Sequence, residues 1–502
     1  MTVVPSLVPS ATPRSKTPGA PAIPRGQNLI GGGFCDARDG ATLPVIDPAR
    51  DRLLTTIPAS GAADVDAAVA AARDAFPAWS ASVTAERADL LDAVADAIER
   101  RLDELALLES LDNGKPVSLA RAVDIPRAVA NFRFFAGAVR HQQTACHPMD
   151  GDALNYTLRR PVGVFGLITP WNLPLYLLSW KVAPALAMGN TVVAKPSELT
   201  PLTATALAGI LQELGAPAGV FNLVHGRGHE AGQAIVEHPD VRGVSFTGGT
   251  ATGARVAAAA APMFKKLSLE LGGKNPTLVF ADCELDEAVR GAARAGFANQ
   301  GQICLCGSRI LVERPIYRRF VDALVEEARA RTPGDPQDPA TGFGALVSAA
   351  HRDKVARYVA LARRDGGVLL CGGRAPELPG ELARGAFYEP TVIDGLSPAS
   401  ETATEEIFGP VVTVHPFDDE REAVRLANCV RYGLAASLWT RDLARAHRVS
   451  AQLASGMVWV NTWLLRDLRV PFGGMKDSGV GREGGRFSLE FFSESRNICI
   501  KL

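Results

Sequence analysis

The sequence predicts an α/β fold built around a doubly wound parallel sheet. Residues 162–168 form a continuous apolar run, as expected of a strand that is buried on both faces. Short apolar runs at 191–194, 220–224 and 244–246 alternate with helical patterns, which indicates parallel strands joined by helices. The chain has 502 residues, beyond the ~250–300 at which one core stops growing, so two or more domains are expected.

Two helices are expected before this sheet. The first covers residues 63–76, is rich in alanine, and should end before Pro77, which cannot donate a helical hydrogen bond. The second covers residues 86–111, where apolar residues recur at helical spacing. It should stop at Asn113-Gly114, because glycine readily adopts the left-handed conformation that closes a helix.

Later segments continue the alternation of strands and helices. Thr200 and Pro201 indicate the N-cap and first residue of a helix that runs to Leu214 and is closed by Gly215. Sheets of this kind bind ligands at the carboxyl ends of their strands. A second alternating region covers roughly residues 271–472, with strands expected at 277–280, 309–312, 411–416 and 457–460.

The composition excludes several classes of protein. A formal net charge of -1 gives no sign of a nucleic-acid or acidic-membrane partner. No apolar run reaches the ~18 residues that a transmembrane helix needs. The eight cysteines show no zinc-binding spacing, so no metal is expected, and a chain of this length does not need disulfides. A reducing compartment, the cytoplasm, is therefore the expected location.

The first 26 residues differ in composition from the rest of the chain. They are rich in proline, serine and alanine, which predicts a disordered tail. The segment is also basic and has no acidic residue, as in a transit peptide. Its prolines would interrupt the amphipathic helix that a transit peptide needs, so the tail is the preferred interpretation.

A cysteine and a carboxylate in two glycine-rich segments indicate acyl chemistry. Cys304 lies in FANQGQICLCGSR, and Glu270 lies in LSLELGGKNP. A lone free cysteine is usually a small buried hydrophobe, and this is the interpretation for Cys306. Beside a carboxylate, however, a thiolate can attack a carbonyl carbon, after which the carboxylate activates water to release the acyl group.

A nucleotide site has only a weak local signal. No G-x-G-x-x-G turn follows a strand, but Gly248, Gly249 and Gly253 in FTGGTATG precede an alanine-rich helix at 251–261. Small residues at a helix N-terminus let backbone N–H groups approach a pyrophosphate. On these residues alone, a glycine-rich turn without a ligand is the preferred explanation of the pattern.

Seven segments together resemble one enzyme superfamily. PWNLP, KPSE, FTGGT, ELGGKNP, GQIC, EEIFGP and PFGGMKDSGVGRE occur in the order found in aldehyde dehydrogenases, and the resemblance extends from about residue 28 to the C-terminus. GQICLCGSR, DIPR and NTWLLRDLRVPFGG further resemble the subgroup that oxidises 2-hydroxymuconate or 2-aminomuconate 6-semialdehyde.

The resemblance implies a division into domains and an oligomer. The NAD-binding domain would comprise residues 27–145 and 161–271, and the catalytic domain residues 272–472. A small β-rich oligomerisation segment would combine residues 146–160 with 486–502. A homodimer or a homotetramer is expected, and the sequence does not distinguish them.

The resemblance also implies roles at the chemical centre. Cys304 would be the nucleophile and Glu270 the base. Asn172 would stabilise the oxyanion together with the Cys304 backbone N–H, as preorganised donors do in acyl transfer. Lys181 would have an electrostatic or proton-relay role. A coenzyme-A-acylating relative is disfavoured, because such enzymes commonly lack a base at the position of Glu270.

NAD is the cofactor implied by the resemblance. Lys195 and Glu198 would hold the adenosine ribose hydroxyls, and a glutamate there would repel the extra phosphate of NADP. Glu406 and Phe408 would position the nicotinamide ribose and ring, whereas Gly249 replaces the usual serine, whose hydroxyl is therefore absent. The other expected contacts are Ile168, Thr169, Pro170, Trp171, Ser197, Gly228, Phe246, Thr247, Gly248, Thr250, Leu271 and Gly272.

Two arginines narrow the substrate. Arg127 and Arg466 fall where family members line the substrate tunnel, and an unpaired buried charge is costly, so an anionic partner is expected. A substrate carboxylate could form a bidentate pair with them. The structural alternative is a salt bridge to Asp124 or Asp467, or exposure to solvent. The other expected substrate contacts are Tyr176, Trp180, Leu305 and Phe472.

Two other functions remain open at this point. One is a broad-specificity or betaine-type aldehyde dehydrogenase, which would share the chemical centre but not the need for an anionic substrate. The other is a non-catalytic NAD-binding structural protein, which the presence of Cys304, Glu270 and Asn172 disfavours.

Overall fold

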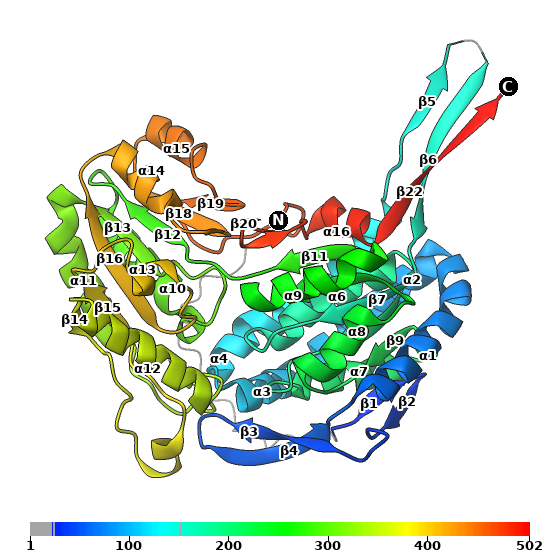
Figure 1. Cartoon of the computed structure of the whole chain (residues 1–502), viewed down its shortest axis with the longest axis horizontal. Helices are drawn as coiled ribbons and strands as arrows, with labels where there is room; N and C mark the ends of the chain where they lie inside the picture. The colour runs from blue at the N-terminus through cyan, green and yellow to red at the C-terminus, as the bar shows by residue number, and fades with distance from the viewer. Residues whose placement is uncertain (1–22, 24–25, 151) are drawn as a thin grey trace.

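The computed structural model describes residues 23, 26–150 and 152–502. The tail expected at residues 1–26 therefore lies almost entirely outside the described residues. Two α/β lobes lie side by side, and a narrow arm extends from one of them (Figure 1).

The first lobe is built on an eight-stranded sheet. Its five central strands are parallel, and the edge strands are antiparallel. The spatial order is β2 (Gly33–Cys35), β1 (Asn28–Ile30), β9 (Phe221–Leu223), β8 (Thr191–Lys195), β7 (Val164–Ile168), β10 (Val241–Thr247), β11 (Lys266–Glu270) and β21 (Gly479–Val480).

Helices cover both faces of this sheet. Phe165 and Leu167 of β7 join one buried cluster, and Val164 and Ile168 join another on the opposite face, which is why the strand is apolar throughout. The first face is covered by α2 (Thr84–Arg100), α3 (Leu102–Asn113), α5 (Ile125–Arg140), α6 (Pro174–Ala187) and α7 (Leu202–Glu213). The second is covered by α1 (Ala62–Ala81), α8 (Gln233–Glu237) and α9 (Thr250–Ala260). The prediction of a doubly wound α/β fold is confirmed.

The second lobe contains a seven-stranded, mostly parallel sheet. Its order is β14 (Val368–Cys371), β15 (Thr391–Asp394), β16 (Val411–Phe417), β13 (Arg309–Glu313), β12 (Pro276–Val279), β18 (Ala435–Trp439) and β19 (Met457–Val460). Its helices are α10 (Leu285–Phe297), α11 (Tyr317–Arg329), α12 (Ala349–Arg364), α13 (Glu401–Thr404), α14 (Glu420–Asn428) and α15 (Leu443–Ser450). The chain passes from one sheet to the other between Glu270 and Pro276, close to the expected boundary at residues 271 and 272.

The arm is a three-stranded antiparallel sheet of β5 (Cys146–Met149), β6 (Ala153–Pro161) and β22 (Ser493–Lys501) (Figure 1). Apart from Pro161, these strands lie within the two segments expected to form an oligomerisation unit. The expected segment at 486–502 also includes most of α16 (Gly485–Phe491), which packs against the first lobe through Leu489. The smaller elements are β3 (Thr42–Asp47), β4 (Arg52–Pro58), β17 (Tyr432–Gly433), β20 (Met475–Lys476), α4 (Val117–Leu119) and the π-helical turn Ala120–Asp124.

The two N-terminal helix predictions were wrong in extent. The helix α1 continues through Pro77 to Ala81, because Trp79 beyond the proline is buried in the core and packing outweighs one lost hydrogen bond. The single helix expected at 86–111 is interrupted at Arg101, whose backbone is non-helical. The apolar pattern does not show this break, because buried positions continue on both sides of it. The predicted stop at Gly114 is confirmed, with φ of +84°.

The predicted cap of α7 was also wrong. The helix begins at Leu202 with Pro201 at its N-cap, and no side chain caps it in the expected way. Instead the Leu202 N–H donates to the Asp112 carboxylate at 2.9 Å, from the end of α3. A tertiary contact therefore replaces the local Thr200 cap.

Candidate active site

The site lies where the first sheet changes direction. From β7 the chain continues through β8 and β9 toward one edge of the sheet, and from β10 it continues through β11 toward the other edge. The strands β7 and β10 therefore form a topological switch point. Ligands of open α/β sheets bind at such a point, outside the carboxyl ends of the strands. The residues expected to bind a cofactor lie at the ends of β7 to β11 or on the segments that follow them: Ile168, Thr169, Pro170, Trp171, Lys195, Ser197, Glu198, Gly228, Phe246, Thr247, Gly248, Gly249, Thr250, Leu271 and Gly272.

The loop before Cys304 has an unusual backbone. Asn299, Gln300 and Gly301 have φ of +49°, +55° and +71°, so three successive residues are left-handed. Two of them are not glycine, and such conformations persist only where the surroundings hold them, often at functional sites. Asn275 contributes to this by donating its side-chain N–H to the Cys304 carbonyl at 2.7 Å. Cys304 follows this loop, between α10 and β13 in the chain, and is half-buried.

Asn172 contacts the same loop. Its side-chain Nδ2 donates to the Gln302 carbonyl at 2.9 Å, and the Asn299 side chain donates back to the Asn172 carbonyl at 3.1 Å. The Cys304 backbone N–H has no acceptor in the described part of the chain. An amide side chain and a free backbone N–H thus lie on neighbouring segments, as an oxyanion site requires.

Glu270 ends β11 and is buried, with 3% of its surface exposed. Neither carboxylate oxygen has a hydrogen-bond partner among the residues that the structure describes. Burial and the nearby Glu483 raise the pKa of Glu270 well above its usual value. A carboxylate in such surroundings is suited to accept a proton from water near neutral pH.

Burial also raises the pKa of the Cys304 thiol, with further contributions from Glu406 and Glu270, while Arg466 opposes them. Asn275, from the same segment as Glu270, donates to the Cys304 carbonyl at 2.7 Å, so the two segments are in contact. The two segments identified from the sequence therefore meet across the boundary between the lobes.

Lys181 is fully buried and belongs to a polar cluster. Its Nζ lies 2.6 Å from Glu483 Oε1 and donates to Ser245 Oγ at 2.8 Å. The sequence interpretation assigned no role to Glu483, although it ends the glycine-rich PFGGMKDSGVGRE segment. An acidic residue at the end of a glycine-rich segment was the available signal.

The residues expected to bind the cofactor provide polar side chains and, at Gly249, open space. Lys195 Nζ lies 3.2 Å from Glu198 Oε2, and burial lowers the pKa of Lys195. The N-cap of α9 is Gly249, which makes no side-chain capping bond and has free space around it. On the other side, Glu406 Oε1 accepts from the Gly273 N–H at 2.8 Å. Phe408 has a left-handed backbone with φ of +62°, and His351 hydrogen-bonds to its carbonyl at 2.7 Å.

Two arginines converge on one tyrosine. Arg466 donates to the Tyr176 hydroxyl at 2.7 Å, and the Arg127 guanidinium lies 5.6 Å from the centre of the Tyr176 ring. Arg466 also lies 4.1 Å from the Phe472 ring centre and 5.4 Å from that of Trp180. These five side chains therefore form one wall of the site.

Of the structural alternatives for the two arginines, the salt bridges are not formed in the described residues, while both side chains keep part of their surface exposed to solvent. Asp467 pairs with Arg469 at 2.5 Å, and Asp124 pairs with Lys115 at 2.5 Å. Within the described residues, neither Arg127 nor Arg466 has a carboxylate within ion-pair distance, and both are half-buried. Leu305 is buried beside Cys304, where its carbonyl accepts from Trp463 Nε1 at 2.9 Å.

Comparison with known proteins agrees with this geometry. Residues 34–498 match the aldehyde dehydrogenase family. The chain belongs to the aldehyde dehydrogenase family. The predictions of an enzyme and of this family's fold are confirmed.

Several relatives in this family match almost the whole chain. The 2-aminomuconic semialdehyde dehydrogenase of Danio rerio is 50% identical, with 95% of this chain and 98% of that protein covered. The 2-hydroxymuconic semialdehyde dehydrogenase of Pseudomonas sp. (strain CF600) is also 50% identical, with 95% and 99% covered. Among solved structures, PnpE of Pseudomonas sp. WBC-3, also solved with nicotinamide adenine dinucleotide, has a TM-score of 0.93 at 45% identity, with 95% and 98% covered.

Proposed function

We propose that this aldehyde dehydrogenase uses NAD to oxidise a carboxylated semialdehyde, such as 2-hydroxymuconate or 2-aminomuconate 6-semialdehyde from aromatic-ring breakdown. The observation that carries the substrate class is the pair Arg127 and Arg466, which lacks a carboxylate partner within the described residues. The names of relatives at about 50% identity support the same class.

The two guanidinium groups favour an anionic substrate on physical grounds. A half-buried cation is stabilised by a carboxylate, and arginine binds one in bidentate geometry. The apolar rings of Trp180 and Phe472 would hold the carbon chain between this carboxylate and the aldehyde. A betaine aldehyde, which is cationic, would be repelled by both arginines, so that alternative is disfavoured.

The chemistry proceeds through Cys304. Its thiolate adds to the aldehyde carbon and forms a thiohemiacetal, whose oxyanion is stabilised by Asn172 Nδ2 and the Cys304 N–H. When bound, NAD supplies the acceptor for the hydride that leaves this carbon. A thioester on Cys304 remains, and Glu270 takes a proton from the water that attacks it. The carbon–sulfur bond then breaks, releasing the acid and restoring the thiolate.

The chain's own residues fit NAD. The uncapped N-terminus of α9 at Gly249 offers backbone N–H groups to a pyrophosphate. Lys195 and Glu198 would bind the adenosine ribose, where the carboxylate disfavours a 2′-phosphate. Glu406 and Phe408 would hold the nicotinamide ribose and ring. The structures of neighbours solved with NAD support this assignment.

We expect Arg466→Ala to lower kcat/KM for a carboxylated semialdehyde, because a substrate carboxylate would lose its charged partner. The decrease should correspond to a loss of about 2–4 kcal/mol of transition-state stabilisation. A neutral aldehyde of similar length should be little affected. Steady-state NADH formation at 340 nm with both substrates measures the difference.

The matched control is Arg469→Ala on the same loop. Arg469 is exposed and already paired with Asp467, so its removal should leave both kcat/KM values near those of the parent enzyme. Equal losses for the charged and neutral substrates in Arg466→Ala would contradict the proposed substrate class and favour a broad-specificity enzyme.

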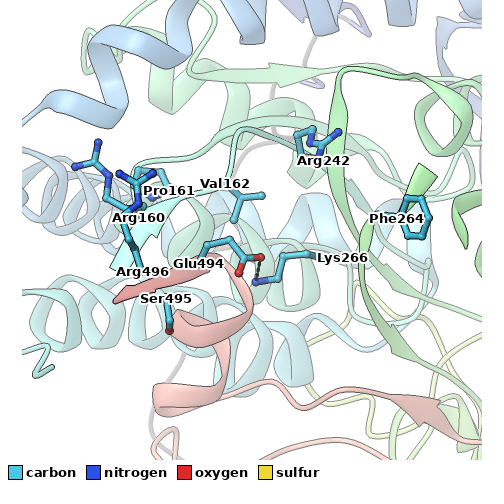
Figure 2. Close-up of a pocket in the computed structure, with 9 residues that line it drawn as sticks. All are labelled: Arg160, Pro161, Val162, Arg242, Phe264, Lys266, Glu494, Ser495 and Arg496. Atoms are coloured by element: carbon cyan, nitrogen blue, oxygen red, sulfur yellow. Dashed lines mark ion pairs between the residues drawn. The ribbon is translucent and has the colours of Figure 1, made fainter. Parts of the chain in front are cut away.

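We also propose that the protein is a homodimer or homotetramer assembled next to the arm. Figure 2 shows a hollow between the arm and β11, where Lys266 forms an ion pair with Glu494 at 3.0 Å. Phe264 borders this hollow and is 91% exposed. A large exposed aromatic beside a projecting sheet with two edge strands is typical of a protein–protein contact, and a second copy is the expected partner.

We expect Phe264→Asp to shift the protein toward smaller species in sedimentation velocity, because a charge would be buried in the contact. Leu443→Asp on α15 is the control, since Leu443 is 72% exposed but belongs to the other lobe. An unchanged sedimentation coefficient for Phe264→Asp would place the subunit contact elsewhere.

The eight cysteines are free thiols, which supports the proposed cytoplasmic location. No helix in the described ranges is long and apolar enough to cross a membrane. The division into an NAD-binding and a catalytic domain remains part of the proposal.

A further inference from the structure

A buried ammonium lies behind the candidate active site. Lys115 is fully buried. Its Nζ lies 2.5 Å from Asp124 Oδ2, 3.0 Å from the Asn172 carbonyl oxygen and 3.8 Å from Glu109 Oε1. No step of the proposed reaction uses this amine, and the sequence interpretation assigned it no role.

The partners of Lys115 come from three separate segments of the chain that border the site. Asn172 is the proposed oxyanion donor. Asp124 directly precedes α5, which carries Arg127 on its first turn. Glu109 comes from α3, and its other oxygen accepts from the Leu175 N–H, next to Tyr176 in the first turn of α6.

These contacts are strong constraints because they are buried. A buried ammonium without its partners is strongly destabilising, so its geometry is held tightly once the ion pairs form. The Lys115 amine therefore links the backbone of Asn172 to the start of the helix that carries Arg127. The link is short, since the Lys115 amine alone joins the Asn172 carbonyl to Asp124.

We propose that Lys115 is a positioning residue that sets the distance between the oxyanion donor Asn172 and the carboxylate-binding Arg127, and thereby the length of semialdehyde that the enzyme prefers. The part of this inference that concerns Arg127 and the substrate carboxylate rests on the proposed function. The part that concerns Asn172 does not, because any aldehyde needs the oxyanion donor.

Other contacts explain why the structure should survive a change at this cluster. Asn299 also donates to the Asn172 carbonyl, at 3.1 Å. Asn131 of α5 donates to the Tyr176 carbonyl at 3.2 Å and to Ser179 Oγ at 3.0 Å on α6. The helices thus remain attached, while the spacing at their first turns depends on Lys115.

The first test is Asp124→Asn, which has nearly the same shape but weakens the ion pair that holds α5. The probes are succinic, glutaric and adipic semialdehyde, with propionaldehyde as a neutral aldehyde. For the semialdehyde length that the parent enzyme prefers, the advantage in kcat/KM over the other lengths should shrink by about 10-fold or more. The reason is that a misplacement near 1 Å can cost on the order of 100-fold in rate. Propionaldehyde should lose less.

The second test is Lys115→Met, which removes the contact to Asn172. We expect kcat for propionaldehyde to fall on the order of 10–100-fold, below the 10²–10³-fold caused by removing an oxyanion donor outright. The dissociation constant for NAD should remain unchanged, which fluorescence quenching measures.

Because Lys115→Met leaves two buried carboxylates, it could unfold. The double variant Lys115→Met/Asp124→Leu replaces the pair by apolar side chains, which often preserves stability. A purely structural role predicts that the melting temperature and the kinetics recover together. Positioning predicts that the melting temperature recovers while kcat and length preference do not.

The control is Arg133→Gln, also on α5. Arg133 forms exposed ion pairs with Asp96 and Glu99, so its loss should change neither length preference nor kcat. Recovery of both kinetic properties in the double variant would overturn the proposal. A parent enzyme without any preference for carboxylated aldehydes would overturn the proposed function instead, and the propionaldehyde result would still decide the role of Lys115 toward Asn172.

Discussion

Cys304→Ser should abolish NADH formation with every aldehyde, with kcat at least ~10⁴-fold below that of the parent enzyme. The thiolate is a far better nucleophile than a serine hydroxyl. Glu270 is the proposed base of the site, and its proposed task is to activate water rather than that hydroxyl. The pKa of the Cys304 thiol is raised by burial, and a serine hydroxyl in the same place would ionise with even greater difficulty. Absorbance at 340 nm measures the loss, and cofactor binding should be retained.

Cys306→Ser is the matched control. The residue lies two positions away, is also buried, and receives the same chemical change. Because it is interpreted as a structural hydrophobe, the variant should keep most of its kcat. Residual turnover in Cys304→Ser comparable to that of Cys306→Ser would show that the protein does not use this nucleophile and that another group attacks the aldehyde.

Glu270→Gln should separate the two halves of the reaction. Without a base, hydrolysis of the thioester should slow by about 10²–10⁴-fold, whereas its formation continues. We therefore expect a rapid release of about one NADH per site followed by slow turnover, and a mass increase of one acyl group on Cys304. Hydroxylamine, which attacks a thioester without needing a base, should partly restore turnover.

The pH dependence follows from the raised pKa of Glu270. Only the ionised carboxylate accepts a proton, so turnover of the parent enzyme should fall as the pH drops through that raised value. In Glu270→Gln the slow hydrolysis should lose this acidic limb, since no group titrates at the position. An unchanged limb, or a variant without a burst of NADH, would assign the base to another residue.

Much of the site could be predicted because its chemistry is local. Cys304 and Glu270 lie in glycine-rich segments that a few neighbouring residues are enough to recognise. The strands that were predicted lie within a few residues of the observed ones, since buried parallel strands are apolar on both faces, whereas β11, β14, β15 and β18 were not predicted. The helix errors at Pro77 and Arg101 arose where packing outweighed a local signal or left the apolar pattern unbroken.

The sequence by itself therefore determined the fold class, and it was enough to propose Cys304 as the nucleophile and Glu270 as the base, because these predictions depend on residue type and short-range spacing. Only the tertiary structure decided which charge pairs with which. Asp467 and Asp124 could have neutralised the two arginines, but they bind Arg469 and Lys115 instead. Each of these carboxylates has more than one cationic side chain near it in the chain, so sequence spacing alone does not select the partner. For Asp124 the selection depends on how α3, α5 and α6 pack, because that packing decides which side chains come within a few ångströms of each other.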